Sequence, residues 1–235
     1  MIQRTLPAAG VAAVLLLLSA ACLPVGEIQE ENRVVERDGA LSAKIDLFMN
    51  VGELRLQGGA EDLLDADFIY NVERWKPQID YRVTGDRGRL TVRQGESSGI
   101  PVGNGRNRWE IHLTEDIPLD IRIDFGAGEG RLNTEGLDMR SLRVDMGVGD
   151  LTIDLTGPRR HDLDVDVDGG VGAATLILPR KIEARVRVDK GIGSVDAREF
   201  VRRGDYYVSS GSGESDKKIS VTISAGIGSI DLRLR

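Results

Sequence analysis

A Gly-x-Gly turn recurs through the second half of the chain, and this repeat constrains the fold more than any other feature of the sequence. The first three intervals between successive turns are 21, 23 and 21 residues, and the last is 35, which indicates one repeat with an insertion. A period in the low twenties, with alternating apolar and polar residues on both sides of each turn, is typical of a β-solenoid. The paired glycines are Gly126 and Gly128, Gly147 and Gly149, Gly170 and Gly172, Gly191 and Gly193, and Gly226 and Gly228.

Each repeat is expected to contain a strand, a Gly-x-Gly corner, a second strand and a return turn. Around one corner, residues 142–146 (LRVDM) and 151–155 (LTIDL) alternate apolar and polar types. A period of two places one face inward and the other outward. Stacking the repeats in chain order places Val144 between Ile123 and Val167. On the outer face, the same alignment predicts Arg143 beside Asp166 and Asp166 beside Arg187.

The region before residue 119 repeats less clearly. Residues 43–56 (AKIDLFMNVGELRL) look like a degenerate copy with Asn50 in place of the first turn glycine, and asparagine tolerates the left-handed conformation. Residues 85–88 (GDRG) predict a hairpin turn, and residues 95–107 predict a glycine-rich surface loop. No amphipathic helix is evident after residue 25. The other strands expected here are residues 63–70, 79–83, 90–94 and 109–113.

The composition narrows the class of protein. A chain of 235 residues suits one domain, its 29 glycines favour turns over helices, and aromatics at 4% require an aliphatic core. The formal net charge of −7 argues against nucleic acid and anionic membrane surfaces as partners. The single cysteine rules out an internal disulfide framework.

The N-terminus predicts export. Residues 1–21 combine Arg4, an apolar run over residues 6–18 and the small residues 19–21 (SAA), which is the pattern of a secretory signal peptide. Cys22 follows directly and resembles the cysteine of a bacterial lipobox, which receives a diacylglyceryl group and becomes the new N-terminus. We therefore expect an extracytoplasmic, membrane-anchored lipoprotein with its lipid on Cys22.

This N-terminal pattern leaves two alternatives open. The lipobox usually has an apolar residue three places before the cysteine, but this chain has Ser19 there. The small residues at 19 and 21 also fit an ordinary signal-peptidase cleavage site without a lipid. The apolar stretch of residues 6–25 is long enough to span a bilayer uncleaved. In each case the rest of the chain lies outside the cytoplasm. After the signal, we expect a polar tether over residues 22–39 and a single domain over residues 40–235.

Several segments together resemble the toast-rack domain family, a group of bacterial adhesin-like envelope proteins. The resemblance spans about residues 40–235 and implies a right-handed β-solenoid. It also implies a structural, adhesive or envelope-stress role, and it brings no catalytic residues. The segments that carry it are 44–56 (KIDLFMNVGELRL), 107–113 (NRWEIHL), 117–128 (IPLDIRIDFGAG), 141–155 (SLRVDMGVGDLTIDL), 176–180 (LILPR), 189–195 (DKGIGSV) and 225–230 (AGIGSI).

A column of aspartates is the strongest candidate for binding chemistry. Stacked carboxylates repel one another, and a bound cation would relieve that repulsion, so a calcium-stabilised binding module is one alternative function. In a calcium-binding nonapeptide repeat, one residue separates the last glycine from the acid that follows it. In this chain an acid follows the second turn glycine directly, and the nine-residue period is absent. Solvated corner acids without a metal are therefore the expected arrangement. The column contains Asp124, Asp145, Asp168 and Asp189.

The sequence predicts no catalytic residue, no cofactor and no small-molecule substrate. His112 and His161 have no second histidine or cysteine at metal-ligand spacing, so both are expected at the surface. Gly-x-Ser-x-Gly, P-loop and HExxH motifs are absent. A β-helix enzyme acting on polysaccharides is the remaining alternative, and it would need an aromatic-lined groove with clustered carboxylates and cations.

Two segments carry residue types favoured at interfaces. The insertion before the last repeat, residues 200–212 (FVRRGDYYVSSGS), contains Arg202, Arg203, Tyr206 and Tyr207. Trp75 lies in a second loop-like stretch between two basic residues. The competing interpretation of both is a capping loop whose aromatic rings cover an open end of the stack.

Taken together, these features predict a non-catalytic envelope lipoprotein that acts as a structural or interaction module, either adhesin-like or part of an envelope-stress system. The expected partners are the membrane, through the lipid on Cys22, and an envelope protein or glycan.

Overall fold

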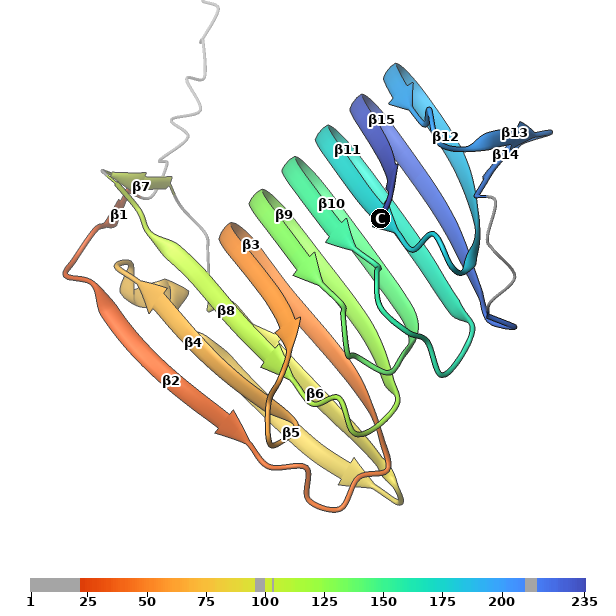
Figure 1. The fold of residues 1–235 in the computed structure, drawn as a ribbon. Helices are drawn as coiled ribbons and strands as arrows, with labels where there is room; N and C mark the ends of the chain where they lie inside the picture. The colour runs from red at the N-terminus through yellow and green to blue at the C-terminus, as the bar shows by residue number, and fades with distance from the viewer. Residues whose placement is uncertain (1–21, 96–99, 103, 210–214) are drawn as a thin grey trace, which may run out of the picture.

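The computed structural model describes residues 22–95, 100–102, 104–209 and 215–235, which form an all-β fold (Figure 1). One mixed sheet holds 13 strands, and β1 and β7 form a separate pair. Within the described ranges, the helical structure is one 3₁₀ turn, η1 (Glu73–Trp75). The predicted signal peptide, residues 1–21, lies outside the described residues. The strands are β1 (Cys22–Pro24), β2 (Gln29–Val35), β3 (Ser42–Gly58), β4 (Leu64–Tyr70), β5 (Gln78–Thr84), β6 (Arg87–Arg93), β7 (Ile100–Val102), β8 (Asn107–Leu113), β9 (Leu119–Asn133), β10 (Met139–Asp154), β11 (Leu163–Leu178), β12 (Glu183–Asp196), β13 (Val201–Arg203), β14 (Tyr206–Val208) and β15 (Lys218–Leu234).

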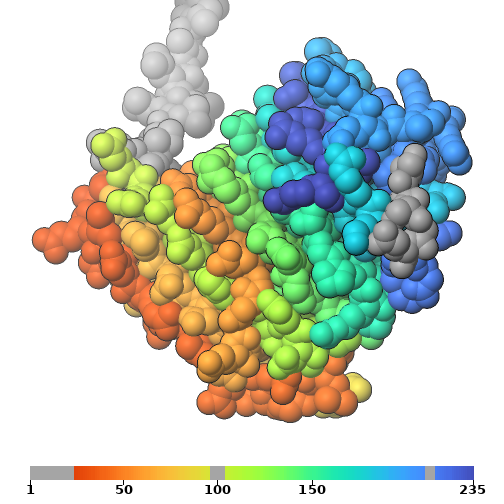
Figure 2. Space-filling model, in the orientation of Figure 1, coloured from red at the N-terminus to blue at the C-terminus, as the bar shows by residue number. Residues whose placement is uncertain are grey.

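Six long strands, each bent in the middle, form the main body of the molecule. In sheet order they are β3, β9, β10, β11, β15 and β12, and they run parallel to one another with their bends aligned. We call the part of each strand before the bend its first leg, the part after it its second leg, and the bend itself the corner. In the space-filling view, chain colours run across the molecule from its N-terminal to its C-terminal end (Figure 2).

The predicted turn glycines form the corners because a side chain has no room there. A Cβ placed on Gly147 would lie 2.4 Å from the carbonyl oxygen of Gly126 in the next strand. The second glycine of each pair has a positive φ, which is +138° at Gly149. The prediction that Asn50 adopts the left-handed conformation is wrong, because Asp38 is the non-glycine residue with a positive φ among the described residues.

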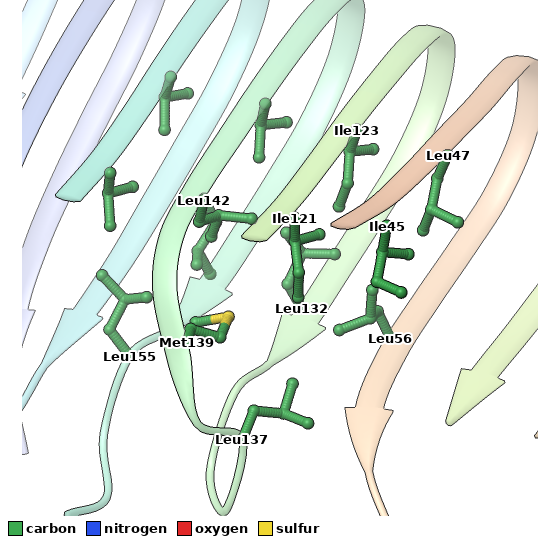
Figure 3. Close-up of a cluster of buried hydrophobic side chains, with 14 of the residues drawn as sticks. Ile45, Leu47, Leu56, Ile121, Ile123, Leu132, Leu137, Met139, Leu142 and Leu155 are labelled. Carbon is green, nitrogen blue, oxygen red and sulfur yellow. The ribbon is translucent and has the colours of Figure 1, made fainter. Parts of the chain in front are cut away.

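The core fills the space between the two legs. Ile45, Ile121 and Leu142 are neighbours along the first legs, Leu56 and Leu132 are neighbours along the second legs, and all five are buried (Figure 3). Burying each of these side chains contributes about 1.5–3 kcal/mol. A single strand cannot bury this apolar face alone, so the strands are stable only as a stack.

The register of the stack confirms one prediction. Val144 pairs with Ile123 on one side and with Val167 on the other, because alignment of the corners fixes the register of the flanking residues. The expected return turns are present between β9 and β10, over residues 134–138, and between β10 and β11, over residues 155–162.

The order of the strands differs from the expected chain order. The C-terminal strand β15 lies between β11 and β12, so β12 does not stack on β11, the long strand before it in the chain. Asp166 consequently pairs with Thr222, and its predicted neighbour Arg187 pairs with Thr222 from the other side. Arg143 therefore lies beside Asp166 in the register as predicted, with its guanidinium paired to Asp145 and Asp168, and the predicted position of Asp166 beside Arg187 is wrong.

At the β3 end the stack divides into two smaller layers. The first leg of β3 pairs with β6, whose other partner is β5, and its second leg pairs with β8, which continues through β4 to β2. The rings of Phe68 and Trp109 meet edge to face, with centroids 5.3 Å apart. The surface loop predicted over residues 95–107 contains β7. The tether predicted over residues 22–39 contains β1 and β2, so this segment is folded into the sheets.

Candidate interaction surfaces at the corners and at the β12 end

The β12 end of the stack has an open edge. One side of β12 pairs with β15 along its full length, whereas β14 covers the other side only at residues 185–187. Residues 188–196 therefore have no strand on their outer side among the residues that the structure describes. Unpaired backbone groups along a sheet edge can accept an added strand.

The β3 end of the stack is closed by two polar side chains. The Oε1 atom of Gln94 accepts hydrogen bonds from the backbone N–H groups of Asn50 and Val51, at 2.9 and 3.2 Å. The Nδ2 group of Asn107 donates to the carbonyl oxygen of Val51 at 2.8 Å. These contacts satisfy the corner of β3, so the stack is sealed at one end and open at the other.

The predicted interaction residues of the insertion lie on a hairpin beside this open edge. Strands β13 and β14 project from the β12 end of the sheet (Figure 1). Arg202, Arg203 and Tyr206 are exposed, and Tyr207 is half-buried against the core. The guanidinium of Arg202 lies 5.9 Å from the centroid of the Tyr207 ring, which orients the arginine by a cation–π contact. We call residues 188–196 together with Arg202, Arg203 and Tyr206 the end surface.

Trp75 does not belong to any exposed surface. It lies in η1, is 3% exposed and packs with Val72 and Val25. Its predicted role as an interaction residue is therefore wrong, because the 3₁₀ turn directs the ring inward while the flanking Arg74 and Lys76 stay exposed.

A row of apolar side chains runs along the outside of the corners. Each is the residue just before the second corner glycine, and each lies next to its equivalent in the neighbouring strand. Ile192 is 73% exposed and Val148 is 54% exposed. With strands about 4.8 Å apart, the row is about 24 Å long. This corner ridge consists of Val51, Ala127, Val148, Val171, Ile227 and Ile192.

A shallow groove of about 680 Å³ runs beside the corner ridge. Its lining includes the predicted aspartate column, but Ser224 of β15 lies between Asp168 and Asp189 and interrupts the column. Arginines pair closely with two of its aspartates. Arg122 contacts Asp145 at 3.0 Å, and an equivalent pair joins Arg143 to Asp168 at 3.1 Å.

Because of these ion pairs, few carboxylate oxygens in the groove are available to bind a cation. Among the described residues, no three His, Cys, Asp or Glu side chains are grouped so that they could hold a metal ion. The groove also has no exposed aromatic platform in its described lining, where Phe125 is buried. The two histidines lie elsewhere. The Nε2 atom of His112 is 3.3 Å from Nε2 of Gln57, and that of His161 is 3.6 Å from Asp138.

The corner ridge and Gln94 were missed by our interpretation of the sequence. The signal for the ridge is present, because the residue between the glycines is Val, Ile or Ala in every copy. The role of Gln94 has no sequence signal, since it depends on contacts across more than 40 residues.

Cys22, the predicted site of lipid attachment, lies in β1 and pairs with Ile100 of β7. The structure holds no helix long and apolar enough to span a bilayer within the part of the chain that it describes, which begins after the apolar N-terminal segment.

Comparisons with known proteins identify a family and solved structures that the chain is similar to. The sequence family described as the N-terminal domain of toast_rack, DUF2154, matches residues 25–177. The crystal structure of a "putative cell adhesion protein" from Clostridium sporogenes ATCC 15579 is 35% identical with a TM-score of 0.83, over 89% of this chain and all of that one. A "putative adhesin" from Bacteroides fragilis NCTC 9343 is 14% identical with a TM-score of 0.36, over 88% of this chain and 97% of that one. No curated protein matches.

Proposed function

The chain belongs to the toast-rack family, and from this membership we propose that it is a non-catalytic interaction protein of the bacterial cell envelope. An adhesin-like role is supported by its likeness to the Clostridium sporogenes protein, whose description names cell adhesion. Participation in an envelope-stress system is the second form that this role could take. The identity of the partner would distinguish the two roles. An adhesin would bind a surface glycan or a matrix protein, and a stress-sensing component would bind a membrane regulator.

The observation that carries this proposal is the asymmetry between the ends of the stack. Gln94 and Asn107 close the β3 corner, whereas no described strand covers residues 188–196 of β12, which lie beside an exposed Arg–Tyr hairpin. Arginine and tyrosine contribute strongly to binding energy at protein interfaces. An uncovered edge of this length is a hazard for a soluble protein unless a partner uses it. We place the partner-binding function on the end surface.

We further propose that the chain is a lipoprotein whose diacylglyceryl group is attached to Cys22 after cleavage of residues 1–21. The membrane is then one partner, and an envelope protein or glycan is the other. The acidic net charge of −7 makes nucleic acid an unsuitable partner. Each bent strand with its return turn corresponds to one coil of a short right-handed β-solenoid, which would serve as a rigid spacer between the two partners.

Anchoring is tested by changing Cys22 to Ala and following incorporation of labelled palmitate in cells. The wild-type protein should take up the label and partition into the detergent phase, and Cys22→Ala should do neither. Equal labelling of the two proteins would contradict the lipid assignment.

Partner binding is tested with isolated cell envelopes and with purified envelope glycans. The double variant Arg202→Ala, Tyr206→Ala should lose binding, while Arg140→Ala, an exposed arginine on β10, should keep it. Binding to glycan alone would favour adhesion, and binding that requires envelope protein would favour a sensing or scaffolding role. Equal binding by the double variant would remove the end surface from the proposal.

A further inference from the structure

The corner ridge needs an explanation of its own, because it lies apart from the end surface for most of its length. Five of its members are between 36% and 73% exposed and are aligned across neighbouring strands. Isolated exposed apolar residues are normal on protein surfaces, but a continuous row marks a contact with another apolar phase. The outward residues on the legs are largely charged, so the ridge is not an extension of a generally apolar surface.

The first described residue of the chain lies at the same end of the molecule as the corners. Cys22 pairs with Ile100 of β7, and the chain continues from β7 to Asn107, whose amide contacts Val51 of the corner ridge. In Figure 1, β1 and β7 lie at the end toward which the bends of the six strands point.

The segment after Cys22 is too short to separate the fold from whatever holds this cysteine. The N–H group of Gly26 donates to the carbonyl oxygen of Asn71 at 2.7 Å, which fixes the chain only four residues after Cys22. Four residues reach at most about 14 Å. An anchor at or before residue 22 therefore keeps the corner end of the molecule close to the membrane.

We propose that the corner ridge rests on the lipid bilayer, with its Val and Ile side chains at the boundary between headgroups and acyl chains. This inference rests on the proposed membrane anchoring of the N-terminus. The two acyl chains of the diacylglyceryl group hold the protein on the membrane, and contact of the ridge with the bilayer would fix the orientation of the domain. Because the anchor holds the ridge at high local concentration, a modest apolar contact is sufficient.

The charges beside the ridge select the kind of bilayer. The described lining of the groove next to it holds four aspartates and one lysine, Lys190, and the arginines nearby are already paired with Asp145 and Asp168. An anionic lipid surface would repel these acids, so the ridge suits zwitterionic headgroups such as phosphatidylethanolamine. In this orientation the second legs and the hairpin of the end surface remain available to a partner.

The test uses the full chain, produced in cells and reconstituted into phosphatidylethanolamine–phosphatidylcholine vesicles. Because the sequence has one cysteine, a cysteine introduced elsewhere can carry an environment-sensitive fluorophore once Cys22 is acylated. Val148→Cys and Ile192→Cys place the probe on the corner ridge, and Arg140→Cys places it on the same strand as residue 148 but away from the corner. Thermal melts should show that all three variants are folded.

The expected result is a blue-shifted emission at positions 148 and 192, quenched by spin-labelled lipid, with neither effect at position 140. Adding phosphatidylglycerol to the vesicles should reduce the quenching. The same emission and quenching at all three positions would overturn the proposal, and so would quenching that rises with phosphatidylglycerol.

The experiment distinguishes a missing lipid on Cys22 from a corner ridge that does not contact the bilayer. If Cys22 carries no lipid, the wild-type chain itself reacts with the probe, which contradicts the proposed lipid attachment. The three variants are then repeated in a Cys22→Ser background bound to the membrane by the apolar N-terminal segment. Unchanged emission at positions 148 and 192 in that background would overturn the ridge proposal independently.

Discussion

Gly149 lies so close to Gly128 that a Cβ on Gly149 would stand 1.9 Å from the Gly128 carbonyl oxygen. The same relationship recurs from strand to strand along the stack, for example between Gly172 and Gly149 at 1.7 Å. Since the contact involves backbone on both sides, no side-chain movement can relieve it. The corner glycines therefore set both the bend and the spacing of the strands.

Changing Gly149 to Ala should strongly destabilise the protein, because it adds this backbone clash to the cost of a φ of +138°. We expect a loss of more than about 3 kcal/mol in the free energy of unfolding, measured by chemical denaturation. Gly59→Ala is the control, since Gly59 has a φ of +103° but open space around its Cβ, and should cost about 1–2 kcal/mol. Equal losses for the two variants would show that close packing at the corner is unimportant.

Gln94, which directly follows β6, should contribute more to stability than an ordinary loop residue. Gln94→Ala removes the acceptor for the N–H groups of Asn50 and Val51, and we expect a loss of about 1–3 kcal/mol. Gln78 is exposed and lines one surface pocket together with Gln94. Gln78→Ala is therefore the matched control and should change the free energy of unfolding little. Hydrogen exchange should also quicken at residues 50 and 51 in Gln94→Ala only, and unchanged exchange there would count against this role.

Glu31 should make the protein sensitive to acid. Tyr70 donates to its Oε1 atom at 2.6 Å, and Lys76 and Arg33 lie within 2.9 Å of the carboxylate. These contacts, the Tyr70 hydrogen bond first, lower the pKa of Glu31 from 4.5 to about 2. Because the folded pKa lies below the unfolded one, the stabilisation is complete above pH 4.5 and is lost as the pH falls toward 2.

Glu31→Gln should therefore lower the melting temperature at pH 7 and flatten its decline between pH 4.5 and 2. Glu30→Gln, at an exposed position on the same strand, should preserve the wild-type profile. Identical pH profiles for wild type and Glu31→Gln would refute the assignment.

Calcium should leave the stability of the protein unchanged. Ser224 separates Asp168 from Asp189, and arginines already pair with Asp145 and Asp168. A cation that bound the native state would raise the melting temperature with concentration. We expect superimposable melts in calcium and in chelator, and a concentration-dependent rise would restore the calcium-stabilised alternative.

The sequence predicts the repeated part of the fold well because the corner glycines align the strands. Once the corners are matched, the pairing of Val144 with Ile123 and Val167 follows from the spacing of the residues. The position of β15 does not follow, because strand order depends on which repeats meet in space. The insertion that contains β13 and β14 gives the chain enough length to return and place β15 between β11 and β12.

The candidate surfaces could be predicted only in part. The exposed arginines and Tyr206 of the hairpin can be recognised by residue type. Trp75 is buried, although it is flanked by basic residues as a surface tryptophan often is. A sequence does not show which way a short 3₁₀ turn directs its side chains. The open edge of β12 is likewise invisible in the sequence, because it arises from the incomplete cover that β14 provides.

Site-specific photo-crosslinking in living cells would show whether the end surface contacts an envelope partner. A photoreactive residue would replace Ser194 on β12 or Tyr206 on the hairpin, with Asp80, exposed on β5, as the control position. We expect adducts of the same discrete mass from positions 194 and 206, and none from position 80. Adducts that are absent at both end-surface positions, or equally frequent at position 80, would contradict the proposed contact.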